Sequence, residues 1–302
     1  MPKGFEFDLL AAAVILSSNS RKPPMKKSAL YTIPTLLGLS QLHATTLLHF
    51  QVNSEDATTV AGGTVPGVDG SADGSVVGSV TLTDDIPLIR PAGGGDRALV
   101  FDGASGITLP GTQQLSNSVI ASAGGFAMEA WISFAGGGNV NSIIDYAGTE
   151  KLVRNGTATG AGFLVNSAAP TYPLGDTTDA SWHYVAAVFS TAADVGGDGS
   201  ITGDLTFYFD STTPVGTESG VTISTFGDSL NRTIGVGMHP VGFAGDFFNG
   251  AIYEPRVSTG ALASNELLIG QAIPEPSSVI LLIGGFGGLA WCRKRRRYYL
   301  NR

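Results

Sequence analysis

The chain has 302 residues, of which 43% are hydrophobic and 42 are glycine, whereas only 14% are charged. That hydrophobic fraction excludes global disorder, and many glycines with few charges favour an all-β fold with tight turns over a helical bundle. The single cysteine, Cys292, excludes an intramolecular disulfide framework and a cysteine-rich zinc site.

Charge is distributed unevenly along the chain. Residues 45–272 hold 6 Lys+Arg against 22 Asp+Glu, a formal net charge of −16, and the other 11 of the 17 basic residues lie at the two ends. Nucleic-acid binding depends on cationic side chains that neutralise phosphates. The acidic middle therefore predicts no nucleic-acid partner.

The N-terminal region predicts a signal peptide over residues 25–44. Met25–Lys27 supplies a basic start, Leu30–Leu39 a short apolar run, and Ala44 a small residue at a cleavage point. Residues 1–24 do not fit this pattern, because Glu6 precedes their apolar run. We expect Met25 to be the true start and residues 1–24 to be an extension; the alternative is one long leader.

Residues 45–272 predict one β-sandwich, because short β-rich runs alternate there with Gly, Asp, Ser and Thr. The expected strands are Thr46–Val52, Ala98–Phe101, Ile107–Leu109, Phe126–Phe134, Ser142–Tyr146, Gly162–Val165, His183–Ser190, Leu205–Asp210, Val221–Ser224, Thr233–Gly237 and Phe248–Val257. About eleven short strands at this spacing indicate a sandwich or jelly roll.

The order of these runs resembles the laminin G-like, concanavalin A-like superfamily. The resemblance rests on six segments: Ala98–Gly103, Phe126–Ile132, Ser181–Ala186, Leu205–Asp210, Phe248–Val257 and Ala261–Leu267. It implies a jelly-roll β-sandwich. Tyr253, Pro255 and Ser211 depart from the family pattern.

Four local features carry structural expectations. Residues 126–134 place apolar side chains at period two, as in a half-buried strand. His183–Phe189 is apolar on both faces, which predicts a central strand. Ala61–Gly78 is Gly-rich and is expected to be a long loop. Pro255 lacks a ladder donor, so its strand is expected to lie at an edge there.

Catalytic patterns are absent from the sequence. Glycosidases place paired carboxylates about a sugar ring, but no Glu-x-Asp-x-x-Glu spacing occurs, and Glu129 is the lone acid of its strand. Glu254 lies two residues before Arg256, which predicts a structural ion pair. No Gly-x-Ser-x-Gly elbow is present, and His183 beside Trp182 is expected to pack. We predict a protein that is not an enzyme, although carboxylates assembled from distant strands are not excluded by sequence.

Calcium is the one cofactor that the sequence suggests, and none is required. Asp194, Asp198 and Asp204 partly follow the spacing of an EF-hand loop, but residue 205, at its twelfth position, is Leu rather than Glu. An ordinary hairpin loop is the alternative. Trp131 and Trp182 lie in strand runs and are expected in the core. Tyr172 and Phe243 are expected in loops, where they are the candidate ligand contacts.

The C-terminal 30 residues have three parts. Pro274-Glu275-Pro276 is followed by fourteen uncharged residues, 279–292, and then by the basic cluster Arg293-Lys294-Arg295-Arg296-Arg297. The uncharged run predicts a single transmembrane helix, short for a bilayer of about 30 Å. The basic cluster is expected to stay cytoplasmic.

This tail, residues 273–302, resembles the PEP-CTERM sorting signal of Gram-negative bacteria. The resemblance implies a membrane-anchored precursor in the inner membrane and cleavage near Pro-Glu-Pro by an exosortase, followed by release to the cell surface or extracellular matrix. A plain stop-transfer anchor is the alternative. The predicted function is non-catalytic binding of extracellular polysaccharide or a surface protein; the alternatives are a polysaccharide-active enzyme and a purely structural protein of the biofilm matrix.

Overall fold

The computed structural model describes residues 44–109, 116–136, 140–146, 150–155, 160–165, 172–195, 199–224, 233–240 and 246–272. The predicted signal helix and transmembrane helix lie outside these ranges. Within them, no helix is both long enough and apolar enough to cross a membrane.

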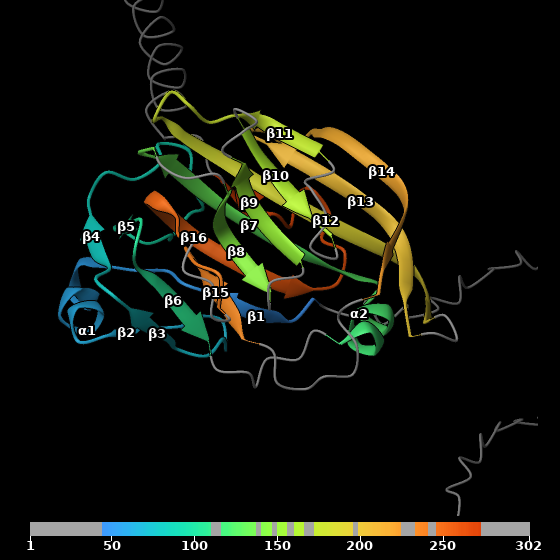
Figure 1. Ribbon diagram of the computed structural model, residues 1–302, viewed down its shortest axis with the longest axis horizontal. Helices are drawn as coiled ribbons and strands as arrows, with labels where there is room; N and C mark the ends of the chain where they lie inside the picture. The colour runs from blue at the N-terminus through green and yellow to red at the C-terminus, as the bar shows by residue number, and fades with distance from the viewer. Residues whose placement is uncertain are drawn as a thin grey trace, which may run out of the picture. The chain divides into compact units, whose positions relative to one another are not determined.

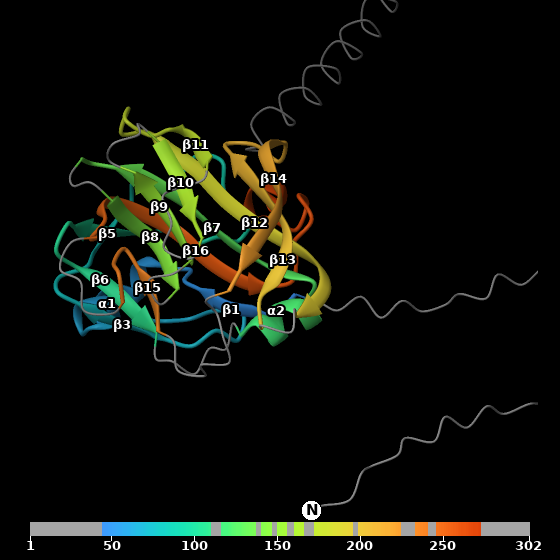
Figure 2. The ribbon, with the colours of Figure 1, turned by 45° about the vertical axis from the view of Figure 1, so that its right-hand side comes forward.

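Two antiparallel sheets pack face to face, as Figures 1 and 2 show. The first sheet has the order β14-β13-β12-β7-β16-β5-β4, and β1 also pairs with β16. Its strands are β1 (Thr46–His49), β4 (Thr81–Thr83), β5 (Ala98–Asp102), β7 (Gly125–Phe134), β12 (Trp182–Val195), β13 (Ile201–Phe209), β14 (Pro214–Ile223) and β16 (Asn249–Thr259).

The second sheet has the order β11-β10-β9-β8-β15-β6-β3-β2. Its strands are β2 (Thr64–Val65), β3 (Gly74–Val77), β6 (Gly106–Leu109), β8 (Val140–Tyr146), β9 (Glu150–Asn155), β10 (Gly160–Leu164), β11 (Tyr172–Asp176) and β15 (Ile234–Val236). The predicted all-β sandwich is confirmed.

Four short helices complete the described fold. They are the 3-10 helix η1 (Ser54–Asp56), α1 (Ala57–Ala61), α2 (Asn117–Ala123) and the 3-10 helix η2 (Leu268–Gln271). Ser116 caps α2 by accepting the Val119 amide at 3.2 Å, and Gly124 ends it in the left-handed conformation at φ +78. Both are standard helix-terminus devices.

The main core fills the space between the sheets. Alternate residues of β7, from Phe126 to Phe134, point into it, as the period-two pattern predicts. They meet Tyr146 and Phe163 of the second sheet, and the Phe126 and Phe163 rings lie 6.2 Å apart. Aromatic pairs at this separation add to the stabilisation from buried apolar area.

A second apolar cluster covers the outer face of the first sheet. Trp131, Tyr184 and Tyr253 project there and are buried by Leu267 and Leu268 of the C-terminal segment. Trp131 therefore lies in the core as expected, whereas Trp182 is only partly buried and packs against the same cluster. The first sheet is therefore buried on both faces at its centre, which explains why β12 is apolar on both sides.

The expectation of a long loop over Ala61–Gly78 is wrong. This segment contains β2 and β3, and β3 pairs with β6 through Ser75–Val77. Gly74 allows the approach, because a Cβ at this position would lie 2.4 Å from Ile107 and 2.6 Å from Phe50. A Gly-rich run can thus be a strand where a neighbouring core side chain occupies the space of the missing side chain.

The expectation of an edge position at Pro255 is also wrong. β16 lies inside the sheet, between β7 on one side and β5 and β1 on the other. The register with β7 shifts between Tyr253 and Arg256, and Glu254 has φ +47. This bulge removes the need for a ladder donor at Pro255, whose carbonyl still accepts the Phe50 amide at 3.2 Å.

Candidate functional site

Four polar side chains meet on the face of the second sheet that points away from the core. Asp145 of β8 and Lys151 of β9 lie directly opposite each other in the ladder. The Lys151 ammonium lies 3.1 Å from an Asp145 carboxylate oxygen and 2.9 Å from Asp246. His239 Nδ1 lies 2.9 Å from the same Asp145 oxygen. We call these four residues the Lys151 cluster.

Three of the four side chains of the Lys151 cluster, those of Asp145, Lys151 and His239, are buried. Ile144 and Tyr146 point into the main core, so Asp145 between them points outward, yet none of its side chain is exposed. Across the outer face, the Asp246 carbonyl accepts the Ser142 amide at 2.9 Å, and the Phe247 carbonyl accepts the Asn141 side-chain amide at 2.5 Å. The connection between β15 and β16 is therefore fixed to β8 near both of its ends.

Two carboxylates determine the charge state of Lys151. Burial alone lowers the pKa of the Lys151 ammonium, but the charges and hydrogen bonds of Asp145 and Asp246 outweigh burial and raise it. Lys151 is therefore positively charged.

The two predicted ligand contacts are placed differently by the fold. Phe243 lies outside the described residues, in the sequence between His239 and Asp246, whose side chains both belong to the Lys151 cluster. Tyr172 does not lie in a loop as expected; it begins β11 at the edge of the second sheet and pairs with Phe163. Tyr172 is a strand residue because β11 pairs with β10, and the edge position of β11 accommodates Pro173.

A second polar cluster joins the start of β12 to the end of β13. His183 Nδ1 lies 2.7 Å from Asp210, and Nε2 lies 2.9 Å from Asp179. The ring stacks on Phe209 with centroids 5.0 Å apart. Burial alone lowers the pKa of His183, but the two carboxylates outweigh it and raise the pKa. The hydrogen bond from His183 lowers the pKa of Asp179, so the carboxylate is charged and the ring holds its proton above the usual pH.

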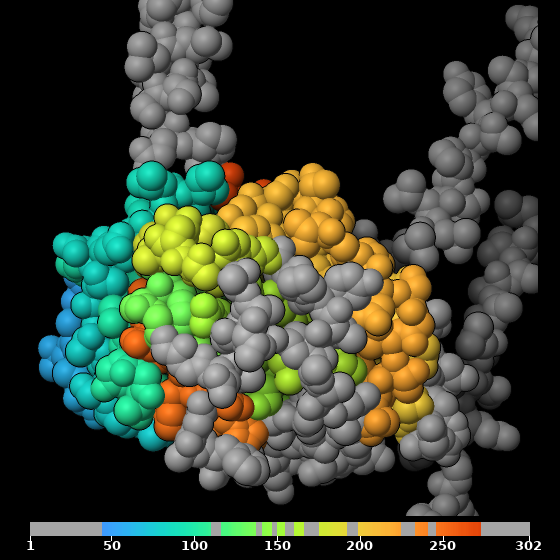
Figure 3. All heavy atoms as spheres, turned by 45° about the horizontal axis from the view of Figure 1, so that its top comes forward, coloured from blue at the N-terminus to red at the C-terminus, as the bar shows by residue number. Residues whose placement is uncertain are grey.

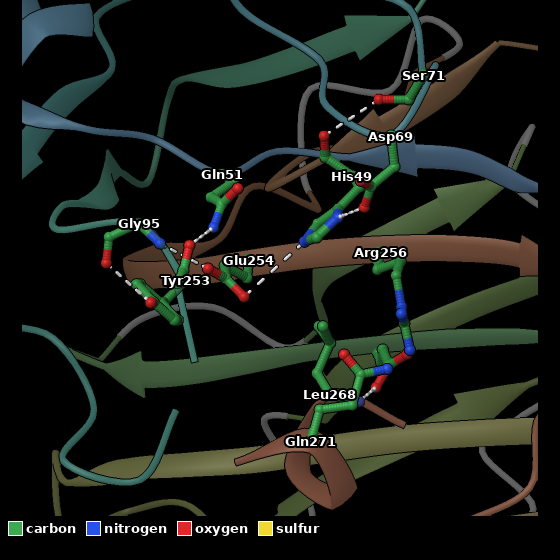
Figure 4. A network of polar contacts seen from close by, with 12 residues as sticks. His49, Gln51, Asp69, Ser71, Gly95, Tyr253, Glu254, Arg256, Leu268 and Gln271 are labelled. Carbon is green, nitrogen blue, oxygen red and sulfur yellow. Dashed lines mark hydrogen bonds and ion pairs between the residues drawn. The ribbon is translucent and has the colours of Figure 1, made fainter. Parts of the chain in front are cut away.

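A third cluster lies where β1 meets the β16 bulge (Figure 4). His49 Nδ1 lies 2.7 Å from Asp69, and the buried Nε2 lies 3.8 Å from Glu254. Glu254 Oε1 accepts the Gly95 amide at 2.7 Å, and the Tyr253 hydroxyl donates to the Gly95 carbonyl at 2.9 Å. Sequence reasoning missed this cluster, because Asp69 lies in the segment expected to be a long loop.

The expected pairing of Glu254 with Arg256 is wrong. The Arg256 guanidinium instead forms two contacts with Glu129 Oε1, of which the Nε contact is 2.7 Å. Tyr184 donates its hydroxyl to the other Glu129 oxygen, which also accepts the Leu268 amide at 2.8 Å. In a regular strand, residues 254 and 256 would lie on the same face. The bulge between Tyr253 and Arg256 instead turns the two side chains to different neighbours.

The calcium prediction is not tested by the described residues. The side chain of Asp194 in β12 and the whole of Asp198 lie outside them, and Asp204 lies within β13, opposite Ser190. β12 and β13 form a hairpin in which Val195 pairs with Ile201. Among the described residues, no group of three or more His, Cys, Asp or Glu side chains is arranged to hold a metal ion.

The sorting residues Pro274, Glu275, Pro276, Arg293, Lys294, Arg295, Arg296 and Arg297 also lie outside the described residues. Residues 272–297 match the PEP-CTERM protein-sorting motif, which confirms the resemblance of the tail. The motif implies export and processing of a membrane-associated precursor by an exosortase in a Gram-negative bacterium. No curated protein matches the chain.

Similar solved structures share the β-sandwich fold. Domain 4 of an extracellular arabinanase from Geobacillus stearothermophilus, in complex with arabinotriose, has a TM-score of 0.50 and 16% identity, covering 76% of this chain and 99% of that one. A Trypanosoma rangeli sialidase in complex with sialic acid has a TM-score of 0.47 and 14% identity, covering 75% and 32%. A structure described for cell entry of botulinum neurotoxin type C has a TM-score of 0.45 and 15% identity, covering 75% and 51%. This chain thus spans about half or less of the length of the sialidase and neurotoxin chains.

Proposed function

We propose that this chain is a non-catalytic surface or matrix protein whose β-sandwich binds extracellular polysaccharide. The sorting motif would deliver it: the precursor is held at the inner membrane by residues 279–292 until an exosortase cleaves near Pro274–Pro276. The sandwich then reaches the cell surface or the extracellular matrix. Calcium is a candidate ligand of its acidic loops, not a required cofactor.

The Lys151 cluster carries the binding part of this proposal. The connection between β15 and β16 includes Phe243, and side chains on both sides of that residue, His239 and Asp246, contact the Lys151–Asp145 pair. Such anchoring lowers the entropy that a loop loses when it binds a ligand. An aromatic side chain such as Phe243 suits stacking on a sugar ring, since its flat apolar face requires no charge.

The ion pairs of three basic side chains favour binding over catalysis. Asp145 and Asp246 contact Lys151, Glu129 contacts Arg256, and Asp179 contacts His183. Each of these carboxylates therefore has a basic partner, whereas hydrolysis of a glycoside needs one carboxyl group that holds a proton near neutral pH. The described residues offer no pair of carboxyl groups free of basic partners at these clusters.

A polysaccharide array probed with the purified full chain in detergent tests the proposal. Arabinan oligosaccharides belong on it, because the similar arabinanase domain was solved with arabinotriose. We expect saturable binding to one glycan class, weakened about two- to tenfold by Phe243→Ala, which corresponds to the energy of an aromatic contact. Val215→Ala, at an exposed position of β14, is the matched control and should change nothing.

The same assay distinguishes the alternatives. Loss of binding in EDTA, restored by calcium, would support calcium sites in the acidic loops, and unchanged binding would contradict them. Release of soluble sugar fragments would contradict the non-catalytic proposal and favour an enzyme. No binding to any glycan would contradict polysaccharide recognition and favour a protein partner or a structural matrix role.

A further inference from the structure

Two adjacent apolar side chains project from the connection between β4 and β5. Leu88 is 82% exposed and Ile89 is 60% exposed, whereas Pro87 and Pro91 on either side are buried. The other exposed large apolar side chains of the described residues, Val77 and Val215, lie on separate strands. Proline fixes φ, so the two buried prolines hold Leu88 and Ile89 on a short, stiff projection.

This projection lies beside the point where the sandwich ends. Pro91 forms a β-bridge with Ala272, the last described residue. Three peptide units separate Leu88 from Pro91, which limits their Cα separation to about 11 Å. Figure 3 shows the same arrangement: the teal surface of this part of the chain lies next to the red C-terminal end.

The membrane segment of the tail begins close to that point. Residues 273–278 separate Ala272 from Val279, where the uncharged run starts. A fully extended chain of this length spans at most about 25 Å. In the anchored precursor, these limits keep Leu88 within about 40 Å of the start of the membrane segment.

The charges near the projection are nearly balanced, with Asp84, Asp85 and Asp96 against Arg90 and Arg97. Asp84 is paired with Arg97 at 3.5 Å, and Asp85 accepts the Trp182 indole N–H at 3.4 Å. Arg90 follows Ile89 directly and supplies a cation for lipid phosphates. The rest of the sandwich is strongly acidic, so it is repelled by anionic lipid, and the Leu88–Ile89 projection is the part suited to approach the bilayer.

We propose that Leu88 and Ile89 insert into the surface of the bilayer that holds the precursor. This inference rests on the proposed function, because it requires the tail to anchor the chain. The tail keeps the projection at a high effective concentration at the bilayer, so two side chains suffice for a contact that would be weak in a free protein. The contact would orient the sandwich and keep residues 274–276 at the level of the membrane surface, where a membrane-bound processing enzyme acts.

Site-directed spin labelling of the full chain tests the inference. In a Cys292→Ser background, Leu88→Cys carries the label, and the protein is reconstituted in vesicles of phosphatidylethanolamine and phosphatidylglycerol. Val215→Cys is the matched control, because β14 lies at the opposite edge of the first sheet from β4. We expect the label at residue 88 to be shielded from a water-soluble nickel chelate and accessible to oxygen, with at least about a threefold higher oxygen-to-nickel collision ratio than at residue 215.

Vesicle flotation separates the failures of the two proposals. If the chain floats with the vesicles but residue 88 is as accessible to the nickel chelate as residue 215, the membrane contact is wrong and the anchor stands. If the chain does not float, the membrane anchor of the proposed function is wrong, and the contact of residue 88 with the bilayer is wrong with it. Ile89→Cys provides a second label site if Leu88→Cys impairs folding, and circular dichroism checks each variant.

Discussion

Arg256 of β16 and Glu129 of β7 form a buried ion pair on the outer face of the first sheet, where they lie directly opposite each other in the ladder. The pair also fixes the end of the domain. Glu129 accepts the Leu268 amide at 2.8 Å, and the Arg256 guanidinium donates to the Glu266 carbonyl at 2.7 Å. The ion pair therefore holds the last turn of the sandwich just before the sorting motif begins.

Arg256→Met should destabilise the sandwich strongly. The substitution leaves the Glu129 carboxylate buried without a cation, which costs about 3–5 kcal/mol in proteins where one partner of a buried pair is removed. Urea unfolding measures the change in the free energy of unfolding. Arg97→Met is the control, because Arg97 pairs with the exposed Asp84 and should cost less than about 1 kcal/mol. Equal losses in the two variants would contradict a structural role for the Arg256–Glu129 pair.

The His183 cluster should make stability depend on pH near neutrality. Asp210 and Asp179 raise the folded-state pKa of His183 above its ordinary value of 6.5 despite burial. The protonated ring therefore stabilises the fold; this contribution is complete below pH 6.5 and is lost as pH rises through the raised pKa. Urea unfolding of the wild type and of His183→Gln across this range should show a difference that shrinks as pH rises.

An NMR titration of the His183 ring checks the cause of that shift. Asp179→Asn removes one of the two carboxylates and should move the pKa of His183 back toward 6.5, because Asp179 is exposed and its loss disturbs little packing. A titration that is identical in the wild type and in Asp179→Asn would show that this carboxylate does not hold the proton on the ring.

Lys151→Met should weaken both the fold and glycan binding. It leaves the fully buried Asp145 without its ammonium partner, which should lower the free energy of unfolding by about 3–5 kcal/mol. It also releases Asp246 at one end of the β15–β16 connection. The double variant Lys151→Met/Asp145→Asn removes both charges and should recover much of the stability, as measured by a double-mutant cycle. If the double variant is as unstable as the sum of its single variants, the two charges do not interact.

Alanine at Pro274, Glu275 and Pro276 should block processing of the tail. Because an exosortase cleaves near this motif in proteins that carry it, the precursor should accumulate in the inner-membrane fraction and be lost from the surface fraction. Immunoblots of the two fractions measure this distribution. Alanine at Ser277 and Ser278 is the matched control and should leave processing intact. Normal release of the Pro-Glu-Pro variant would contradict exosortase sorting.

Much of the fold could be predicted because its patterns are local. Residues 126–134 alternate in hydrophobicity and form β7, and the doubly apolar run 183–189 lies in the interior strand β12. β9 was missed, because Lys151 and Arg154 interrupt its apolar pattern. Both side chains are buried nonetheless, Lys151 by its ion pairs and Arg154 by the Phe134 ring, 3.8 Å from its guanidinium carbon.

The sequence alone determined the all-β class, the acidic middle domain and the sorting tail, because periodicity, composition and a short motif are properties of neighbouring residues. Only the tertiary structure decided which charges meet. Glu129 and Arg256 are 127 positions apart, and Lys151 and Asp246 are 95 apart. Such pairs depend on the register between strands that are far apart in the sequence. They also depend on the bulge at Glu254, which redirects the side chains around it. The same long-range packing pairs Pro91, three residues after Leu88, with Ala272, the last described residue.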